Sequence, residues 1–183
     1  MSPSPDDLLE RRLERIEHRL DHVEAQRAIA QTMYHYIDAC DRTKDAERIS
    51  GLFTDDAVWE GRGNFAEFGQ TSGRVAIREM FVENPKMLPF TAHYLTNPVI
   101  GVSMDARSGW GKWHTLEAAT LRNRSAQVWI AALYDNDFEK VGHEWLIKHL
   151  RFTDIFVVPY EEGWLRTRYV SPNTLIKQVE LDD

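Results

Sequence analysis

The first half of the chain has apolar residues at helical spacing, and the second half has them at strand spacing. Helices are expected over residues 5–40, 46–53 and 74–83, where apolar residues recur every three or four positions. A short strand is expected at 57–60, and long strands at 91–102, 109–122, 125–138 and 144–158. Helices followed by long strands indicate an α+β fold, with helices packed on one face of a curved antiparallel sheet.

The first 23 residues carry a helical pattern of their own. Residues 4–7, Ser-Pro-Asp-Asp, supply a helix N-cap, a proline at the first helical position and an acidic first turn. Apolar residues then recur at spacings of four, three, four and three amid charged residues, at Leu9, Leu13, Ile16, Leu20 and Val23. Two interpretations stay open: an amphipathic helix packed on its own domain, or a contact between subunits.

The pattern divides the chain into three parts. Residues 1–23 form an N-terminal tail and helical extension, 24–158 form one α+β domain, and 159–183 form a C-terminal tail without clear periodicity. A chain of 183 residues with 43% hydrophobic content is long and apolar enough for one core. The C-terminal tail is expected to cover the open end of a cavity or to dock on a neighbouring subunit.

Charge and composition exclude several classes of partner. The formal net charge is -7 and no dense run of lysine and arginine appears, so we expect neither nucleic acid nor a membrane as a partner. The N-terminus lacks the apolar core of a signal peptide, and no apolar run approaches the ~20 residues of a membrane span. The single cysteine, Cys40, rules out an internal disulfide. We therefore expect a cytoplasmic protein.

The end of the first domain helix carries candidate chemistry. Tyr36 and Asp41 are five residues apart, which places them about 140° apart around a helix, so both can border one wide pocket. By itself, an aspartate near a helix end is usually solvated. The pair becomes informative together with His93, Glu117 and Arg151, which fall on the expected strands.

Alternation along the strands sorts these candidates, because residues two apart share a face. Trp113 and Glu117 share one face of their strand, and the sequence leaves open whether that face is the inner one. On the last strand, His149 and Arg151 share a face, so if Arg151 points inward His149 does too, unless a bulge intervenes. A buried arginine needs an anionic or hydrogen-bonding partner.

These residues resemble a known family. Tyr36 and Asp41 on a helix, the segment 91–94 (Thr-Ala-His-Tyr) opening a strand, Trp113 with Glu117 four residues later, and 149–152 (His-Leu-Arg-Phe) look like the nuclear transport factor 2-like superfamily. Within it, they are most similar to the SnoaL-like group near bile-acid 7-alpha-dehydratase, with scytalone dehydratase and lindane dehydrochlorinase more distant. The resemblance covers roughly residues 24–158 and implies a cone-like sheet with helices on its concave side.

The resemblance also implies roles for single residues. Asp41 and His93 match the family's aspartate and histidine dyad, whereas Tyr36 and Arg151 match a tyrosine and a late-strand arginine of the bile-acid dehydratase. Glu117 stands where the bile-acid enzyme has an aspartate. Glu117, His149 and Trp113 are the candidate substrate-binding residues. Relatives with this pattern imply a homo-oligomer, with a trimer favoured.

The functional groups of the same residues are suited to proton transfer. An imidazole held by a carboxylate has its tautomer fixed and its basicity raised, so His93 with Asp41 can move a proton to or from a substrate. Tyr36 can donate a hydrogen bond to an enolate oxygen, and Arg151 can stabilise that charge or hold a substrate carboxylate. This chemistry requires no metal and no cofactor.

The leading hypothesis is a cofactor-independent lyase of the dehydratase type, acting on a hydrophobic polycyclic or aromatic hydroxylated substrate. Two alternatives stay open. One keeps the proton chemistry and changes the bond, as in an isomerase, a cyclase or a retro-aldol carbon-carbon lyase acting on an aromatic diol. The other is a non-catalytic ligand-binding or assembly module, since family membership alone does not establish an enzyme.

Overall fold

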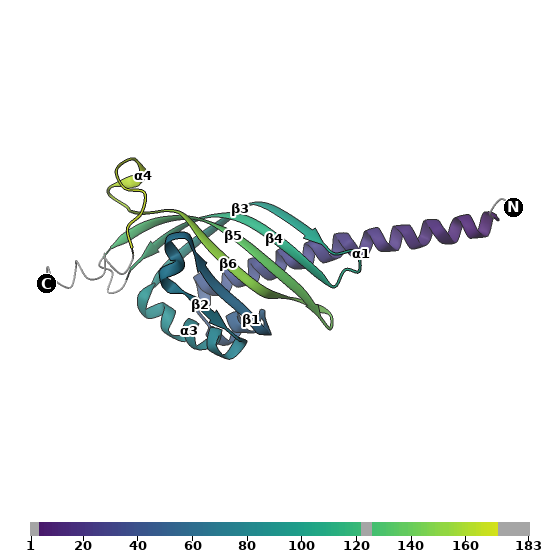
Figure 1. Cartoon of the computed structure of the whole chain (residues 1–183), viewed down its shortest axis with the longest axis horizontal. Helices are drawn as coiled ribbons and strands as arrows, with labels where there is room; N and C mark the ends of the chain where they lie inside the picture. Colours follow the sequence, from purple (N-terminus) through teal and green to yellow (C-terminus); the bar gives the residue numbers. More distant parts are fainter. Residues whose placement is uncertain (1–3, 122–125, 172–183) are drawn as a thin grey trace.

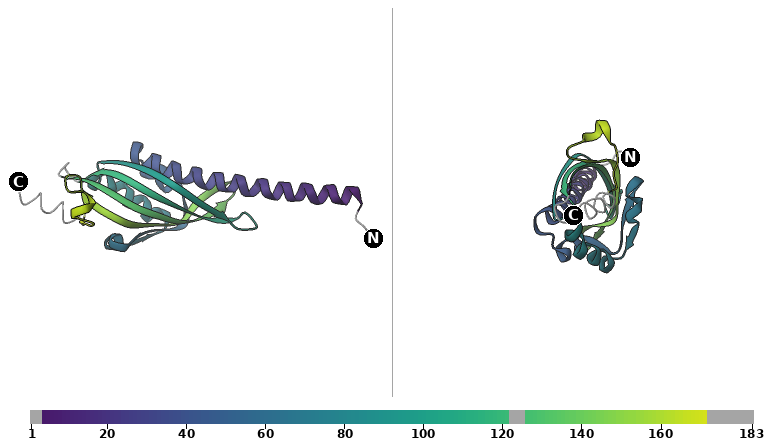
Figure 2. Two further views of the ribbon diagram at one scale, coloured as in Figure 1. Left: turned by 90° about the horizontal axis from the view of Figure 1, so that it is seen from above. Right: turned by 90° about the vertical axis from the view of Figure 1, so that its left-hand side faces the viewer.

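A curved six-stranded sheet wraps around one long helix in the computed structural model of the protein, which describes residues 4–121 and 126–171 (Figures 1 and 2). The strand order is β2-β1-β6-β5-β4-β3. The expected α+β class is confirmed, with a cone-like, unclosed sheet, helices on its concave side and an N-terminal helical extension.

The elements follow the predicted order of helices first and long strands afterwards. The helices and helical turns are α1 (Pro5–Asp38), η1 (Ala39–Thr43), α2 (Ala46–Ser50), η2 (Gly63–Phe68), α3 (Arg74–Met87) and α4 (Gly163–Arg166). The strands are β1 (Phe53–Arg62), β2 (Gln70–Ser72), β3 (Phe90–Val102), β4 (Ser108–Thr120), β5 (Gln127–Val141) and β6 (Glu144–Pro159).

Helix α1 is continuous from the extension into the domain. It begins with the predicted cap: the backbone N–H of Asp7 donates to the Ser4 hydroxyl at 3.1 Å, and the backbone N–H of Ser4 donates to the Asp7 carboxylate at 2.9 Å. Its second half is buried against the sheet through the side chains of Ala25, Ile29, Thr32, Met33, Tyr36 and Ile37. The first half extends beyond the sheet, as Figure 1 shows.

The sheet is mixed, with one parallel pair of strands. Strands β3, β4, β5 and β6 form the predicted antiparallel meander. Strand β1 pairs in parallel with β6 and antiparallel with β2. The parallel pair is possible because α3 and the whole meander intervene between β1 and β6 in the chain, which provides the long crossover that parallel strands require.

Several local boundaries differ from the sequence expectation. The helix expected over 46–53 is α2, Ala46–Ser50, and Phe53 already belongs to β1. The strand expected at 57–60 is β1, Phe53–Arg62. The loop expected at 61–73 contains η2 and β2. Helix α3, expected to end at residue 83, includes Pro85 and ends at Met87; the proline lacks the N–H that would bond to the Phe81 carbonyl, and the helix ends two residues later. The turn expected between 122 and 125 lies outside the described residues.

Two apolar clusters on the concave side of the sheet leave a space between them. The larger cluster packs the second half of α1 against the sheet and includes Ile29, Met33, Phe53 and Ile147. The smaller cluster lies near the other end of the strands and is built from Phe65, Ala119, Leu121, Val128, Ile130, Ala132 and Val157. The candidate site is the space that these clusters border.

The described part of the C-terminal tail packs close to this space. Tyr169 forms a parallel bridge with Val157, and its hydroxyl donates to the Glu67 carboxylate of η2 at 2.8 Å. The hydroxyl of Ser171 donates to the same carboxylate at 2.9 Å. These contacts hold η2 against the sheet, and η2 supplies two cavity-lining side chains, Phe65 and Phe68. Residues 172–183 of the tail lie outside the described residues.

Candidate active site

A cavity of about 440 Å³ lies between α1, α3, η2 and the concave face of the sheet. Its walls are mainly apolar and aromatic, and include Trp59, Phe65, Phe81, Ile130, Tyr134 and Phe152. This size and lining are typical of sites for small organic molecules, which span about 300 to 1,000 Å³. The ionisable residues on its wall are therefore the candidates for chemistry.

His93 lies at this wall and is in direct contact with Asp41. Asp41 Oδ1 lies 2.6 Å from Nδ1 of His93, and the backbone N–H of His93 donates to Asp41 Oδ2 at 2.8 Å. Asp41 reaches His93 because the helix ends in a π-type turn, closed by a hydrogen bond from the Lys44 N–H to the Ala39 carbonyl at 2.7 Å. The two bonds to one carboxylate fix the orientation of the imidazole ring.

Glu117 faces the other nitrogen of the same imidazole. In the register of β3 and β4, Glu117 is directly opposite His93, which brings the two side chains together on the inner face. Glu117 Oε2 lies 3.1 Å from Nε2 of His93, and both side chains are nearly buried, 4% and 9% exposed. The imidazole is thus held between two carboxylates, one on each nitrogen.

The opposite charges of His93 and the two carboxylates shift the pKa of His93 and of Asp41. Burial lowers the pKa of His93, but Glu117 and Asp41 outweigh it and raise that pKa to about 10. Burial raises the pKa of Asp41, and the hydrogen bond and charge of His93 more than compensate, so the pKa lies below its usual value. At neutral pH, His93 is therefore an imidazolium that can donate a proton.

Lys44 is a cavity residue that the sequence analysis did not select. Its ammonium donates to the Cys40 carbonyl and to the Thr91 hydroxyl, each at 3.1 Å, and burial lowers its pKa. The residue ends the π-type turn with a left-handed backbone, φ 51°. A lysine three positions after Asp41 gave no signal in the sequence, because its approach to the cavity depends on that turn.

Two tyrosines contribute neutral hydroxyl groups to the wall. Tyr36 and Tyr134 line the cavity, and their rings meet edge to face with centroids 6.4 Å apart. Burial raises the pKa of both phenols well above its usual value. The structure thus places Tyr36 at the site as predicted and adds Tyr134, which adjoins the Asp135 to Asp137 segment of β5.

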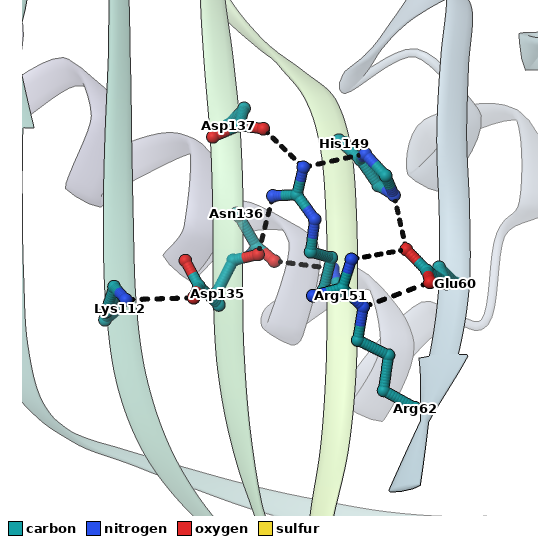
Figure 3. A network of polar contacts seen from close by, with 8 residues as sticks. All are labelled: Glu60, Arg62, Lys112, Asp135, Asn136, Asp137, His149 and Arg151. Carbon is teal, nitrogen blue, oxygen red and sulfur yellow. Dashed lines mark hydrogen bonds and ion pairs between the residues drawn. The ribbon is translucent and has the colours of Figure 1, made fainter. Parts of the chain in front are cut away.

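Arg151 and His149 do not line the cavity. They lie with Glu60 and Asp137 on the opposite face of the sheet (Figure 3). Arg151 donates to the Asp137 carboxylate at 2.6 Å and contacts His149 Nδ1 at 2.9 Å, while His149 Nε2 lies 2.8 Å from Glu60. The expectation that they point into the site is wrong. A register shift between β5 and β6, where Asp137 pairs with His149 but Phe138 pairs with Ile147, reverses the alternation.

Trp113 also lies outside the cavity. It points to the same side of β4 as Glu117, but it is buried in the core, 1% exposed, with its ring centroid 6.1 Å from that of Phe138. Four residues of strand separate it from Glu117 by about 13 Å. Trp113 is therefore a core residue, and a substrate-binding role is excluded by its position.

The sequence pattern of the SnoaL-like domain matches residues 21–151. The chain belongs to the SnoaL-like domain family. This agrees with the superfamily inferred from single residues, while the nearness to bile-acid 7-alpha-dehydratase stays a prediction. No curated protein sequence matches the chain.

Several solved structures share the SnoaL-like fold of this chain. A hexachlorocyclohexane dehydrochlorinase of type 2 is 24% identical, with 77% of this chain and 92% of that chain covered and a TM-score of 0.69. A type 3 enzyme from Novosphingobium barchaimii is 22% identical, covering 79% and 95%, with a TM-score of 0.67. A structure named as a scytalone dehydratase from Novosphingobium aromaticivorans is 20% identical, covering 85% and 97%, with a TM-score of 0.67.

The site of this SnoaL-like protein is suited to proton transfer. Within residues 4–121 and 126–171, no group of three or more His, Cys, Asp or Glu side chains is arranged to hold a metal ion. Among the described helices, none is long and apolar enough to cross a membrane. The cavity wall offers a buried carboxylate, an imidazolium, an ammonium and phenolic hydroxyls, which together can remove a proton, deliver one and bind a developing negative charge.

Proposed function

We propose that the protein is a cofactor-independent lyase of the dehydratase type, acting on a hydrophobic polycyclic or aromatic hydroxylated substrate. The observation that carries this proposal is the contact of His93 with Glu117 at the wall of an apolar cavity, with Asp41 bound to the other side of the His93 ring. A dehydratase must remove a proton from carbon and protonate a departing hydroxyl group. Glu117 and the His93 imidazolium supply these two functions side by side.

The residues of the site can accept and supply each proton that the reaction moves. Glu117 accepts a proton from a carbon next to a carbonyl group, and Tyr36 donates a hydrogen bond to the enolate oxygen that forms. Nε2 of His93 then transfers its proton to the leaving hydroxyl as the carbon-oxygen bond breaks, which yields water and a double bond. The proton on Glu117 returns to His93 across their 3.1 Å contact and restores the starting state.

The protonation state of His93 favours a hydroxyl leaving group over a halide. Chloride departs without being protonated, whereas hydroxide is a poor leaving group and needs a proton donor. A histidine whose pKa is raised to about 10 is such a donor at neutral pH. This distinguishes the proposed activity from that named for the dehydrochlorinases of the same fold.

The cavity indicates the class of substrate. Its apolar, aromatic lining suits fused or substituted rings, which gain from burial and from edge or face contacts with Phe81 and Phe152. The Lys44 ammonium at the wall can bind a carbonyl, carboxylate or phenolate oxygen of the substrate. A substrate of about 440 Å³ or less that carries one anionic or carbonyl oxygen fits these features.

The proposal is tested by incubating the protein with a panel of hydroxylated steroids, aromatic ketols and lignin-type diols, followed by mass spectrometry. Loss of water from one substrate class supports a dehydratase. An unchanged mass with a changed retention time indicates isomerisation or cyclisation, and release of a small aldehyde indicates retro-aldol cleavage. Binding of ligands in the cavity without any product contradicts the enzyme and supports the binding module.

A further inference from the structure

The first half of α1 carries an apolar seam that its own domain leaves uncovered. The seam residues are between 50% and 61% exposed, and they are Leu9, Leu13, Ile16, Leu20 and Val23. Apolar residues scattered singly on a surface need no explanation, but a continuous row at heptad spacing marks an interaction surface. This seam lies outside the proposed active site and is independent of it.

The seam points away from the body of the protein. The helix touches the β3 to β4 turn through His18 and His22, whose Nε2 atoms lie 3.1 and 3.3 Å from the Met104 carbonyl, and it enters the core through Ala25 and Ile29. At about 100° per residue, these four residues share one side of the helix, and the seam is centred on the opposite side. Packing on its own domain, one of the two interpretations left open by the sequence, is therefore excluded.

The seam is presented on a helix that is already formed. The second half of α1 is buried in the domain and held in place, and the first half projects from it as a rigid continuation (Figures 1 and 2). An isolated helix forms poorly in water because the nucleation of its first turn is unfavourable. Here the folded domain supplies the nucleus, so association loses little conformational entropy.

The charges beside the seam are complementary in only one orientation of two helices. In the heptad that places Leu13 and Leu20 at positions a, the e positions are acidic and the g positions are basic, with Glu10, Glu17 and Glu24 at e and Arg12 and Arg19 at g. Parallel helices place each g residue beside the e residue five positions later in the neighbour, so arginine meets glutamate. Antiparallel helices place e beside e and g beside g, which opposes like charges.

The core positions favour more than two helices. Positions a hold leucine, at Leu13 and Leu20, and positions d hold Leu9, Ile16 and Val23. Leucine at a combined with β-branched residues at d favours trimers and tetramers over dimers. The trimer expected from the sequence falls within this range.

The geometry points to a parallel coiled coil formed by residues 5–24 of more than two copies of this chain. The partner is the chain itself, because the arginine and glutamate rows that flank the seam match each other between identical, parallel, in-register helices. The coiled coil would hold the catalytic domains at one end of a common stalk.

Cysteine cross-linking tests the register and the orientation. In the full chain with Cys40→Ser, we expect Leu9→Cys to form a disulfide with its copy under glutathione disulfide at least about tenfold faster than Arg11→Cys, because only the seam position is held close to its copy. Arg11 lies on the side of the helix opposite the seam and is the matched control. Equal rates at the two positions would overturn the proposal.

Charge reversal tests the pairing rule with the fold intact. Arg12→Glu with Arg19→Glu should slow the Leu9→Cys cross-link, and adding Glu17→Arg with Glu24→Arg should restore it, while circular dichroism shows an unchanged helix content. Light scattering of the unmodified chain at micromolar concentration should give the mass of at least three chains. A monomer or dimer mass contradicts the proposal. So does a variant with all four charge reversals that forms the Leu9→Cys cross-link no faster than the variant with only the two arginine reversals.

Discussion

Two histidine-centred networks lie back to back on the same sheet and use similar residues. On the inner face, His93 is held between Asp41 and Glu117. On the outer face, His149 is held between Glu60 and Arg151, which in turn binds Asp137 (Figure 3). In both, an imidazole joins a carboxylate to another charged group. From the sequence alone, members of both networks were expected to lie in one site.

Their surroundings separate the two networks. The inner carboxylate of Glu117 is 4% exposed and borders an apolar cavity, whereas the outer carboxylate of Asp137 is 45% exposed. Charges interact strongly where water is excluded and weakly where water screens them. The same residue types therefore border an enclosed apolar cavity or lie at a partly exposed surface, according to which side of the sheet they occupy.

Removing the inner proton acceptor should have the largest effect. Replacing Glu117 by Gln leaves the shape of the side chain but removes its capacity to accept a proton, so kcat should fall by about 10² to 10⁴-fold. The measurement is initial rate on the substrate identified by the water-loss screen, with circular dichroism as the folding control. Activity within a few-fold of the unmodified protein would contradict the role of Glu117.

Weakening the support of the imidazole should have the next largest effect. Asp41→Asn removes the charge that orients and stabilises the His93 imidazolium, and kcat should fall by about 10²-fold. Because the pKa of His93 then falls, the alkaline limb of the activity profile should move to lower pH. An alkaline limb that stays in place would contradict this positioning role even if the rate dropped.

Lys44→Met should affect binding selectively. The variant keeps the length of the side chain and removes the ammonium, so ligands with a carboxylate or phenolate should bind about tenfold more weakly. Neutral ligands of the same shape should bind as before. Isothermal titration calorimetry with a matched acid and amide pair measures the difference, and an equal loss for both would indicate a packing effect instead.

The pKa of His93 predicts a pH dependence of stability. A group whose pKa is raised in the folded state stabilises the protein fully below its unfolded value of 6.5, and this contribution is lost as pH rises through about 10. The free energy of unfolding of the unmodified protein, relative to that of His93→Gln, should therefore decrease over this range. Urea titrations at several pH values measure it, and a flat difference would contradict the pKa.

Breaking the outer network should have the smallest effect. Arg151→Gln removes an ion pair to the partly exposed Asp137 and should lower the free energy of unfolding by roughly 1 kcal/mol or less. The kcat should stay within about twofold, because no part of the outer network borders the cavity. A large loss of kcat with an intact fold would indicate that Arg151 contributes to the active site. It would contradict the distinction between the inner and the outer network.

Much of the fold could be predicted from the sequence. The helical spacing of Ile29, Met33 and Tyr36, the Ser4 cap and the long alternating strands are local patterns, so they specify helix, strand and the α+β class without tertiary information. The approach of Asp41 to His93 was also predicted, through the family resemblance. The parallel pairing of β1 with β6 was not, since pairing between distant segments leaves little trace in either strand.

The local pattern of the chain identifies the candidate residues and assigns each to a helix or a strand. Packing across the sheet then selects the face of the sheet on which each of these side chains lies. One register shift in β6 sends Arg151 outward, and the register of β3 against β4 brings Glu117 to His93. A π-type turn brings Lys44 to the cavity. A shift of one residue in the pairing register moves every following side chain of a strand to the other face of the sheet. Such shifts depend on packing across the whole sheet, so a single strand sequence does not reveal them.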